Sequence, residues 1–108
     1  MDIKEAVSTL ESLAHETRLG VFRLLVQAGP DGLSAGAISD RLGALQNTMS
    51  SHLHKLDRAG IIKSRREGRH IIYSANFESL SGLLVYLMDD CCGGSAAVCE
   101  PVAASMKN

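Results

Sequence analysis

The chain has 108 residues, 45% of them hydrophobic, which supports one small domain with a modest core. The longest apolar run, Leu83 to Met88, is far shorter than the roughly 20 residues of a membrane-spanning helix, and the first residues lack the basic-then-apolar pattern of a secretory signal. The odd number of cysteines, three, argues against a structural disulfide framework. We therefore expect a cytoplasmic protein with reduced thiols.

Basic residues are concentrated in the middle of the chain, although the net charge is only −1. Residues 41–70 carry seven basic and two acidic side chains, a balance of +5, whereas the rest of the chain carries four basic and ten acidic ones, a balance of −6. A basic segment inside an acidic chain is typical of a nucleic-acid contact surface. A solvated surface with balanced neighbours would show the same pattern, so the charges alone leave both interpretations open.

The first part of the chain predicts three helices. Residues 2–14 carry apolar side chains at three- and four-residue steps, the pattern of an amphipathic helix. Residues 16–28 are apolar on most sides, which predicts a central helix that ends at the Gly-Pro-Asp-Gly turn. A short third helix should follow, capped by the Ser34 hydroxyl and ended by Gly43.

The second part predicts two longer helices with a hairpin between them. A fourth helix is expected over 46–59 and a last helix over 77–90. Residues 61–67 and 70–75 are β-branched and partly alternating, with Gly68 in the turn between them, which indicates a two-stranded hairpin. The fold is therefore predicted to be mainly α with a small β-hairpin. The stripe of the fourth helix that should be buried consists of Met49, Leu53 and Leu56.

Two short helices joined by a glycine-containing turn and followed by a basic hairpin are the order of a winged helix-turn-helix. An α-helix fits the DNA major groove, where amide and hydroxyl side chains hydrogen-bond to base edges, and Lys and Arg contact phosphates. A polar helix face can also be merely solvated, and it is the order of the elements together with the charge pattern that favours DNA. The predicted DNA-binding residues are Gln46, Asn47, Thr48, Ser50, Ser51, His54, Lys55, Arg65, Arg66 and Arg69.

Three segments resemble the ArsR/SmtB family of small dimeric bacterial repressors. Residues 12–19 resemble the start of the family's second helix. Residues 46–62 resemble its recognition helix and the turn that leads into the wing, which is the β-hairpin, and residues 65–73 resemble the wing itself. One departure is Glu16, where proline is frequent in relatives, and it affects only the start of that helix. His52 matches a histidine common in the recognition helix of relatives and is therefore added to the predicted DNA-binding residues. For its side chain, a phosphate contact or packing beside the wing is favoured over base reading.

The resemblance implies a homodimer through the first and last helices, and the apolar stripes of both helices agree with it. Such a two-fold dimer would bind a palindromic operator, and DNA binding would need no cofactor. The family's inducer sites also lie at known places. The Cys-x-Cys motif of the third helix is absent from 34–40, and 77–88 contain no histidine. All three cysteines of the chain, Cys91, Cys92 and Cys99, lie after these segments, and we call them the cysteine cluster.

The cysteine cluster resembles the three-cysteine site that a subset of arsenic-responsive members carry beyond the last helix. Thiolates are soft ligands, and trivalent arsenic or antimony makes three bonds to sulfur. Zinc prefers four ligands and would need a further donor such as Asp89 or Asp90. We therefore expect As(III), possibly Sb(III), as inducer. Another soft metal (cadmium, lead or copper) and oxidation or persulfide sensing stay open.

These arguments divide the chain into a DNA-binding and dimerisation domain, 1–90, and a cysteine-containing tail, 91–108. A thiol enzyme such as an arsenate reductase is disfavoured, because no glycine-rich anion loop opens a helix and the cysteines have acidic neighbours. A metal carrier would not need the recognition helix or the hairpin. We expect a dimeric repressor that is no enzyme and that leaves its operator when the inducer binds.

Overall fold

The computed structural model of the chain describes residues 1–43 and 46–88, and for Gln46 it describes the backbone alone. The predictions about the cysteine cluster and the tail after residue 90 lie outside the described residues. In the described part of the chain, no helix combines the length and the apolarity that a membrane span requires.

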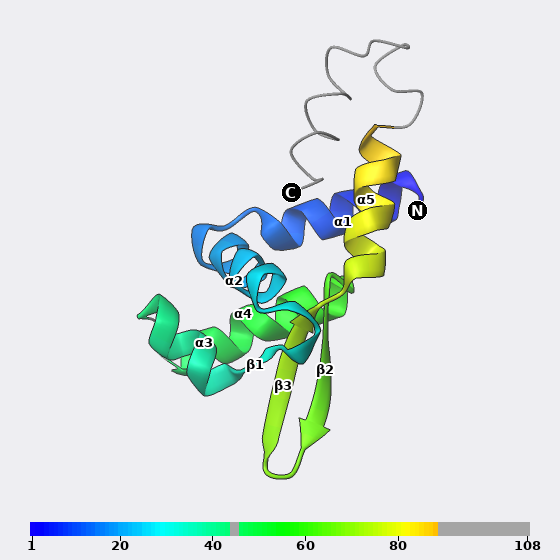
Figure 1. Ribbon diagram of the computed structural model, residues 1–108. Coiled ribbons are helices and arrows are strands. Elements are labelled where there is room, and N and C mark those ends of the chain that lie inside the picture. The colour runs from blue at the N-terminus through cyan, green and yellow to red at the C-terminus, as the bar shows by residue number, and fades with distance from the viewer. Residues whose placement is uncertain (44–45, 89–108) are drawn as a thin grey trace.

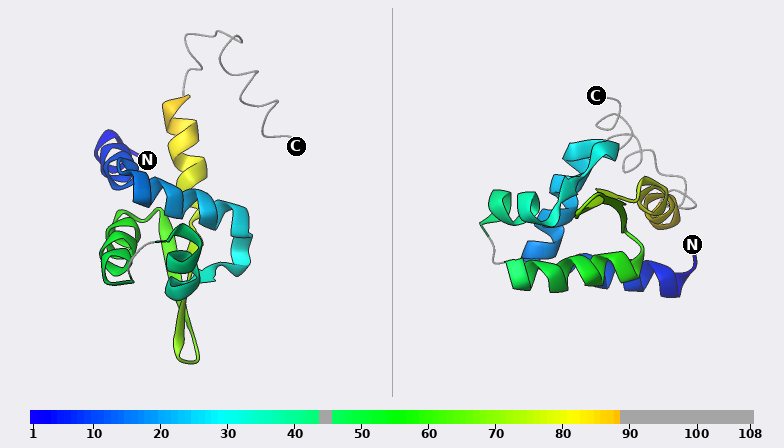
Figure 2. Two further views of the ribbon diagram at one scale, coloured as in Figure 1. Left: turned by 90° about the vertical axis from the view of Figure 1, so that its left-hand side faces the viewer. Right: turned by 90° about the horizontal axis from the view of Figure 1, so that it is seen from below.

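Five α-helices, a short 3-10 helix and three strands follow one another in the described residues. In chain order they are α1 (Ile3–Leu13), α2 (Glu16–Ala28), η1 (Gly29–Asp31), β1 (Leu33–Ser34), α3 (Ala35–Leu42), α4 (Gln46–Ala59), β2 (Ile62–Glu67), β3 (His70–Ala75) and α5 (Phe77–Leu87). The hairpin of β2 and β3 projects from a helical body, and α5 leaves on the side opposite the hairpin tip (Figures 1 and 2). The predicted mainly helical fold with a small hairpin is confirmed.

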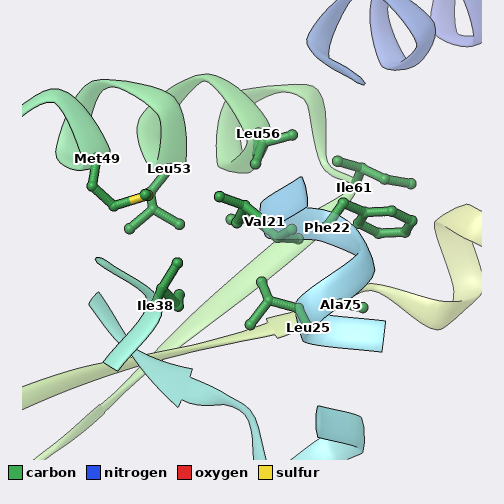
Figure 3. Packing of buried hydrophobic residues seen from close by; sticks show 10 residues of the cluster. Val21, Phe22, Leu25, Ile38, Met49, Leu53, Leu56, Ile61 and Ala75 are labelled. Carbon is green, nitrogen blue, oxygen red and sulfur yellow. The ribbon is translucent and has the colours of Figure 1, made fainter. Parts of the chain in front are cut away.

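The core lies where α2, α3 and α4 meet the base of the sheet. Side chains from all of these elements point into one cluster (Figure 3). The predicted stripe of α4 is confirmed, because each of its three apolar side chains is at most 1% exposed. Burying a Leu, Val, Ile, Phe or Met side chain stabilises the fold by about 1.5–3 kcal/mol, so α4 is held firmly by one side and its opposite side faces solvent. The buried cluster comprises Val21, Phe22, Leu25, Ile38, Met49, Leu53, Leu56, Ile61, Ile62 and Ala75.

Local capping fixes where several helices begin and end. The Ser34 Oγ accepts a hydrogen bond from the Ala37 N–H at 3.2 Å, and Gly43 ends α3 in the left-handed conformation, as predicted. Asn76 caps α5, since its Oδ1 accepts from the Ser79 N–H. Its Nδ2 also donates to the carbonyl of Gly60 at 2.9 Å, which ties the start of α5 to the turn after α4.

The structure differs from the sequence prediction at two places. The hairpin belongs to a three-stranded antiparallel sheet of order β1-β3-β2, because Leu33 and Ser34 pair with Tyr73 and Ile72. The last helix ends at Leu87, with Met88 as its C-cap, whereas the sequence predicted a helix to residue 90; residues 89 and 90 lie outside the described part of the chain. Acidic side chains at a helix C-terminus oppose the helix dipole, and the two residues after Met88 are both aspartates, which is a physical reason for the earlier end.

Candidate nucleic-acid interface

One side of α4 gathers short polar side chains that can hydrogen-bond to DNA bases. Asn47, Ser50, Ser51 and His54 follow the i, i+3, i+4, i+7 spacing, so they lie on one face of the helix, and all four are exposed. The buried apolar stripe occupies the opposite side. We call these four residues the reading face. The structure thus brings together four of the predicted DNA-binding residues on one rigid surface.

The other predicted residues of α4 flank the reading face or fall outside the description. Thr48 and Lys55, seven residues apart, are exposed along one edge of it. The Asn47 Oδ1 accepts a hydrogen bond from the Thr48 backbone N–H at 2.8 Å. Among the described residues this is the single hydrogen bond of the Asn47 side chain, and its NH2 group remains as a donor. The side chain of Gln46 lies outside the description.

His52 lies on a different side of α4, against the corner between α1 and α2. Its Nδ1 is 3.4 Å from Arg18 Nη1, and its ring centroid is 4.7 Å from that of His15 at a tilt of 45°. Packing beside the wing was one of two alternatives for His52, and the partners that its side chain shows lie instead at the start of α2. Its position between helices supports a structural role over base reading.

Arg18 and His15 complete this contact between three helices. Arg18 Nε donates to the carbonyl of Ser12, the penultimate residue of α1, at 2.7 Å. His15 Nδ1 accepts from the Thr17 N–H at 3.1 Å and so caps α2. Partial burial, the adjacent His15, Arg18 and then Lys55 lower the pKa of His52 from its usual value. The neutral imidazole is therefore the form that the fold favours here.

The hairpin carries arginines on both sides and at its tip. Glu67 and His70 form its last pair before a two-residue turn at Gly68 and Arg69. Arg66 and Arg69 are exposed, and within residues 1–43 and 46–88 neither has a hydrogen bond or ion pair to another side chain. Arg65 differs, because its guanidinium donates to protein acceptors. Arg66 and Arg69 therefore keep all their N–H groups available to DNA phosphates, whereas Arg65 uses three of its five within the protein.

A shallow groove of about 460 Å³ continues the reading face toward α1. Ser51, His54, Lys55 and Arg58 line its α4 side, and Glu11 lies on the α1 side. Arg58 is not among the residues that the sequence predicted to bind DNA. Its position, one turn beyond His54, adds a positive charge next to the reading face.

Two further helices expose apolar side chains that a single copy leaves in water. Ile3 in α1 and Val85 in α5 are each 66% exposed, and Leu87 is 55% exposed. Val7 and Leu10 extend the exposed stripe of α1. Apolar patches of this kind mark association surfaces, which agrees with the predicted dimer contacts of the first and last helices.

The described residues contain no group of three or more His, Cys, Asp or Glu side chains that could hold a metal ion. The cysteine cluster lies outside this search.

The chain is similar to known transcriptional regulators in both sequence and fold. A family model described as a helix-turn-helix domain matches residues 13–65. The transcriptional activator HlyU of Vibrio cholerae is 30% identical over 83 residues, 77% of this chain and 74% of that protein. The structure of reduced HlyU superimposes with a TM-score of 0.64, covering 80% of this chain and 90% of that one.

Two further solved structures share the fold over most of their length. An ArsR-like transcriptional regulator from Rhodococcus sp. RHA1 is 26% identical with a TM-score of 0.69, covering 96% of this chain and 91% of that one. The homodimeric winged helix-turn-helix DNA-binding domain of Mb0332 from Mycobacterium bovis, a possible ArsR-family regulator, is 26% identical with a TM-score of 0.66 and covers 82% of each chain. The chain thus belongs to the family of ArsR-like winged helix-turn-helix transcriptional regulators, which bind DNA and are not enzymes.

Proposed function

We propose that the chain is a dimeric repressor that binds a palindromic operator and is released when trivalent arsenic or antimony binds Cys91, Cys92 and Cys99. The observation that carries the DNA-binding part is the reading face of α4, exposed beside a hairpin whose Arg66 and Arg69 are exposed too. Helix and hairpin supply the two kinds of contact that specific binding needs, to base edges and to phosphates.

The exposed apolar stripes of α1 and α5 support the dimer. Two copies related by a two-fold axis would present two α4 helices to half-sites spaced by roughly 34–36 Å, one turn of DNA. Mb0332, which shares the fold, forms a homodimer. A palindromic operator follows from this symmetry, because each half-site meets the same reading face.

Repression rather than activation is part of the proposal. HlyU, at 30% identity, is named an activator, so membership of the family leaves the direction of regulation open. A dimer bound across a promoter blocks the polymerase directly and needs no additional contact surface. Transcription of the chain's own promoter in vitro should therefore fall when the protein is added.

The donor set of the cysteine cluster supports a trivalent metalloid as inducer. Three thiols displace the three hydroxyl groups of arsenous acid as three water molecules, so the product is neutral. Six residues separate Cys92 from Cys99, and two of them are glycines, so one chain is long enough to bring all three sulfurs together. The inducer must bind the DNA-free form more tightly than the bound form, and a hundredfold loss of DNA affinity needs only about 2.7 kcal/mol of coupling.

A thiol-redox sensor is the second candidate, favoured by the fact that one HlyU structure is specifically of the reduced protein. Two of the three cysteines could then form a disulfide in place of the metalloid adduct. Another soft metal, such as cadmium, would use the same thiolates.

The experiment is fluorescence anisotropy of the full-length protein on the DNA upstream of its own gene, with thiols kept reduced by a phosphine. Arsenite should release the DNA, while a scrambled duplex should bind weakly with or without arsenite. Release by peroxide alone, in a parallel sample from which the phosphine has been removed, would favour the redox sensor, and release by cadmium alone would favour a soft-metal sensor. Binding that stays complete at saturating arsenite would overturn the arsenic proposal but leave the repressor intact.

A further inference from the structure

The Arg65 side chain is bonded to the protein through all three of its nitrogens. Nη1 donates to the carbonyl of Pro30 at 3.1 Å and Nη2 to the carbonyl of Asp31 at 2.7 Å. Nε donates to Glu67 Oε2 at 3.1 Å, a contact that is also an ion pair. The guanidinium therefore joins β2 to η1, more than thirty residues earlier in the chain.

The topology of the sheet explains why such a link matters. In the order β1-β3-β2, the strand β1 pairs with β3, and β2 is the outer strand of the hairpin. The segment from η1 to β1 therefore has backbone hydrogen bonds to β3 but none to β2 among the described residues. Arg65 reaches past β3 to that segment, and it supplies the hydrogen bonds between β2 and η1 that the backbone does not.

The close fit between η1 and β3 fixes the surface on which Arg65 acts. A Cβ added to Gly32 would lie 2.3 Å from the Tyr73 carbonyl oxygen and 2.9 Å from Ile72 Cγ2. Ile72 is the register partner of Arg65, and directly opposed residues share one face of an antiparallel pair. The Arg65 side chain thus lies on the same face of the hairpin as the turn after α2.

We propose that Arg65 is a positioning residue of the DNA-binding surface: its guanidinium fixes the hairpin at a set angle to the helical body, while Arg66 and Arg69 of the same hairpin contact the DNA backbone. This inference rests on the proposed DNA-binding function. Arg66 follows Arg65 directly and therefore lies on the opposite face of the strand. Holding β2 still lowers the entropy that the hairpin must lose when its tip meets the phosphates.

The bonds of Arg65 are exposed, so they act on local geometry rather than on global stability. Its side chain is 45% exposed and that of Glu67 is 56% exposed, and surface ion pairs contribute little to the free energy of unfolding. An arginine donates through five N–H groups, so two N–H groups of Arg65 remain free to meet a phosphate. A direct phosphate contact is the alternative role of Arg65, and the experiment separates the two roles.

The first readout needs no DNA and compares Arg65→Ala, Arg65→Lys and Arg66→Ala in the full-length protein. Amide hydrogen exchange over residues 62–75 should quicken in both Arg65 variants and stay unchanged in Arg66→Ala. Lysine keeps the charge but cannot span two carbonyls and a carboxylate with one rigid group. Unchanged exchange in Arg65→Ala would overturn the positioning role, whatever the protein's DNA target is.

The second readout is the salt dependence of binding to the upstream duplex. Each phosphate contact contributes about 0.9 to the slope of log affinity against log salt, so Arg66→Ala, which removes one contact per subunit, should lower it by about 2 per dimer. Arg65→Ala should keep the slope and lose affinity by about tenfold at every salt concentration, roughly the worth of one net hydrogen bond. Arg65→Lys should behave like Arg65→Ala.

A lowered slope in Arg65→Ala, together with near wild-type binding by Arg65→Lys, would assign Arg65 to the phosphates instead. A wild-type protein that does not distinguish the upstream duplex from a scrambled one would contradict the proposed operator function. The exchange readout would still decide the role of Arg65 in that case.

Discussion

Arg18 Nη1 lies 3.4 Å from His52 Nδ1 and joins the second helix to the recognition helix. The same guanidinium donates through Nε to the last turns of α1 at the carbonyl of Ser12. Three helices therefore meet at one cation, and one of them carries the reading face while another carries the exposed apolar stripe of α1. Protonation of His52 would place a second positive charge beside the Arg18 guanidinium at this junction.

Acidification should destabilise the fold through His52. Burial and the neighbouring cations lower its pKa in the folded chain below the usual 6.5. Between that lowered value and 6.5 the unfolded chain binds more protons than the folded one, so the free energy of unfolding falls as the pH drops through this window. The measurement is the urea midpoint at about pH 7.5 and about pH 5.5, in the range where histidine titrates.

The matched variants are His52→Gln and His54→Asn on the same helix. His52→Gln should lose less stability on acidification than wild type, because its amide does not titrate. His54→Asn keeps the contact with Arg18, so it should retain the loss that arises from His52. Equal pH dependence in wild type and His52→Gln would show that the contact carries no proton linkage.

Gly32→Ala should destabilise the protein much more than Gly29→Ala. Both glycines have positive φ, +71° and +74°, with ψ about ±180°, a region that residues with a Cβ rarely adopt, so alanine costs about 1–3 kcal/mol at either position. At Gly29 an added Cβ meets nothing within 4 Å, whereas at Gly32 it would lie 2.3 Å from the Tyr73 carbonyl oxygen. The difference, about 2 kcal/mol or more, is measured by urea unfolding at one fixed protein concentration. Equal losses would mean that the η1–β1 segment shifts freely away from β3.

Asn47→Ala should weaken operator binding while leaving non-specific binding nearly intact. A paired amide–base contact contributes about 1–3 kcal/mol of discrimination, so the ratio of operator to scrambled-duplex affinity should fall about tenfold or more. Because the Asn47 Oδ1 also accepts from the Thr48 N–H, a thermal melt must show that α4 remains folded. Gln27→Ala, exposed on α2, is the control and should change neither affinity. An unchanged ratio in Asn47→Ala would remove this residue from the reading face.

The sequence predicted the helices well where periodicity and capping agree. The stripe of Met49, Leu53 and Leu56 and the cap at Ser34 depend on neighbours within one or two helical turns, so local patterns contain them. The strand β1 was not predicted, because a strand of two residues is too short to show an alternating pattern of apolar and polar side chains. Contacts across the fold, such as the one between His15 and His52, leave no local signal at all.

Arg65 illustrates the same limit in the candidate site. Three arginines near a hairpin turn have the same chemistry in a sequence, and all were predicted to contact DNA. What separates them is the position of the Pro30 and Asp31 carbonyls, which only the packing of η1 against β3 determines. The placement of the three arginines on one hairpin was thus predictable, but which of them bonds to the rest of the fold was not.

Replacing any one cysteine of the cluster by serine should abolish the release of operator DNA by arsenite. Cys91→Ser, Cys92→Ser and Cys99→Ser each remove one of three As–S bonds, and a serine hydroxyl is a hard ligand that does not replace a thiolate. Operator affinity without inducer should stay within about threefold of wild type, and the roughly hundredfold arsenite effect should disappear. Anisotropy titrations of each variant with arsenite, and of wild type with zinc as the control metal, give the comparison. A variant that loses operator binding without inducer would assign its cysteine to the structure of the dimer. A variant that arsenite still releases from DNA would reduce the site to two thiols and weaken the case for a pyramidal metalloid.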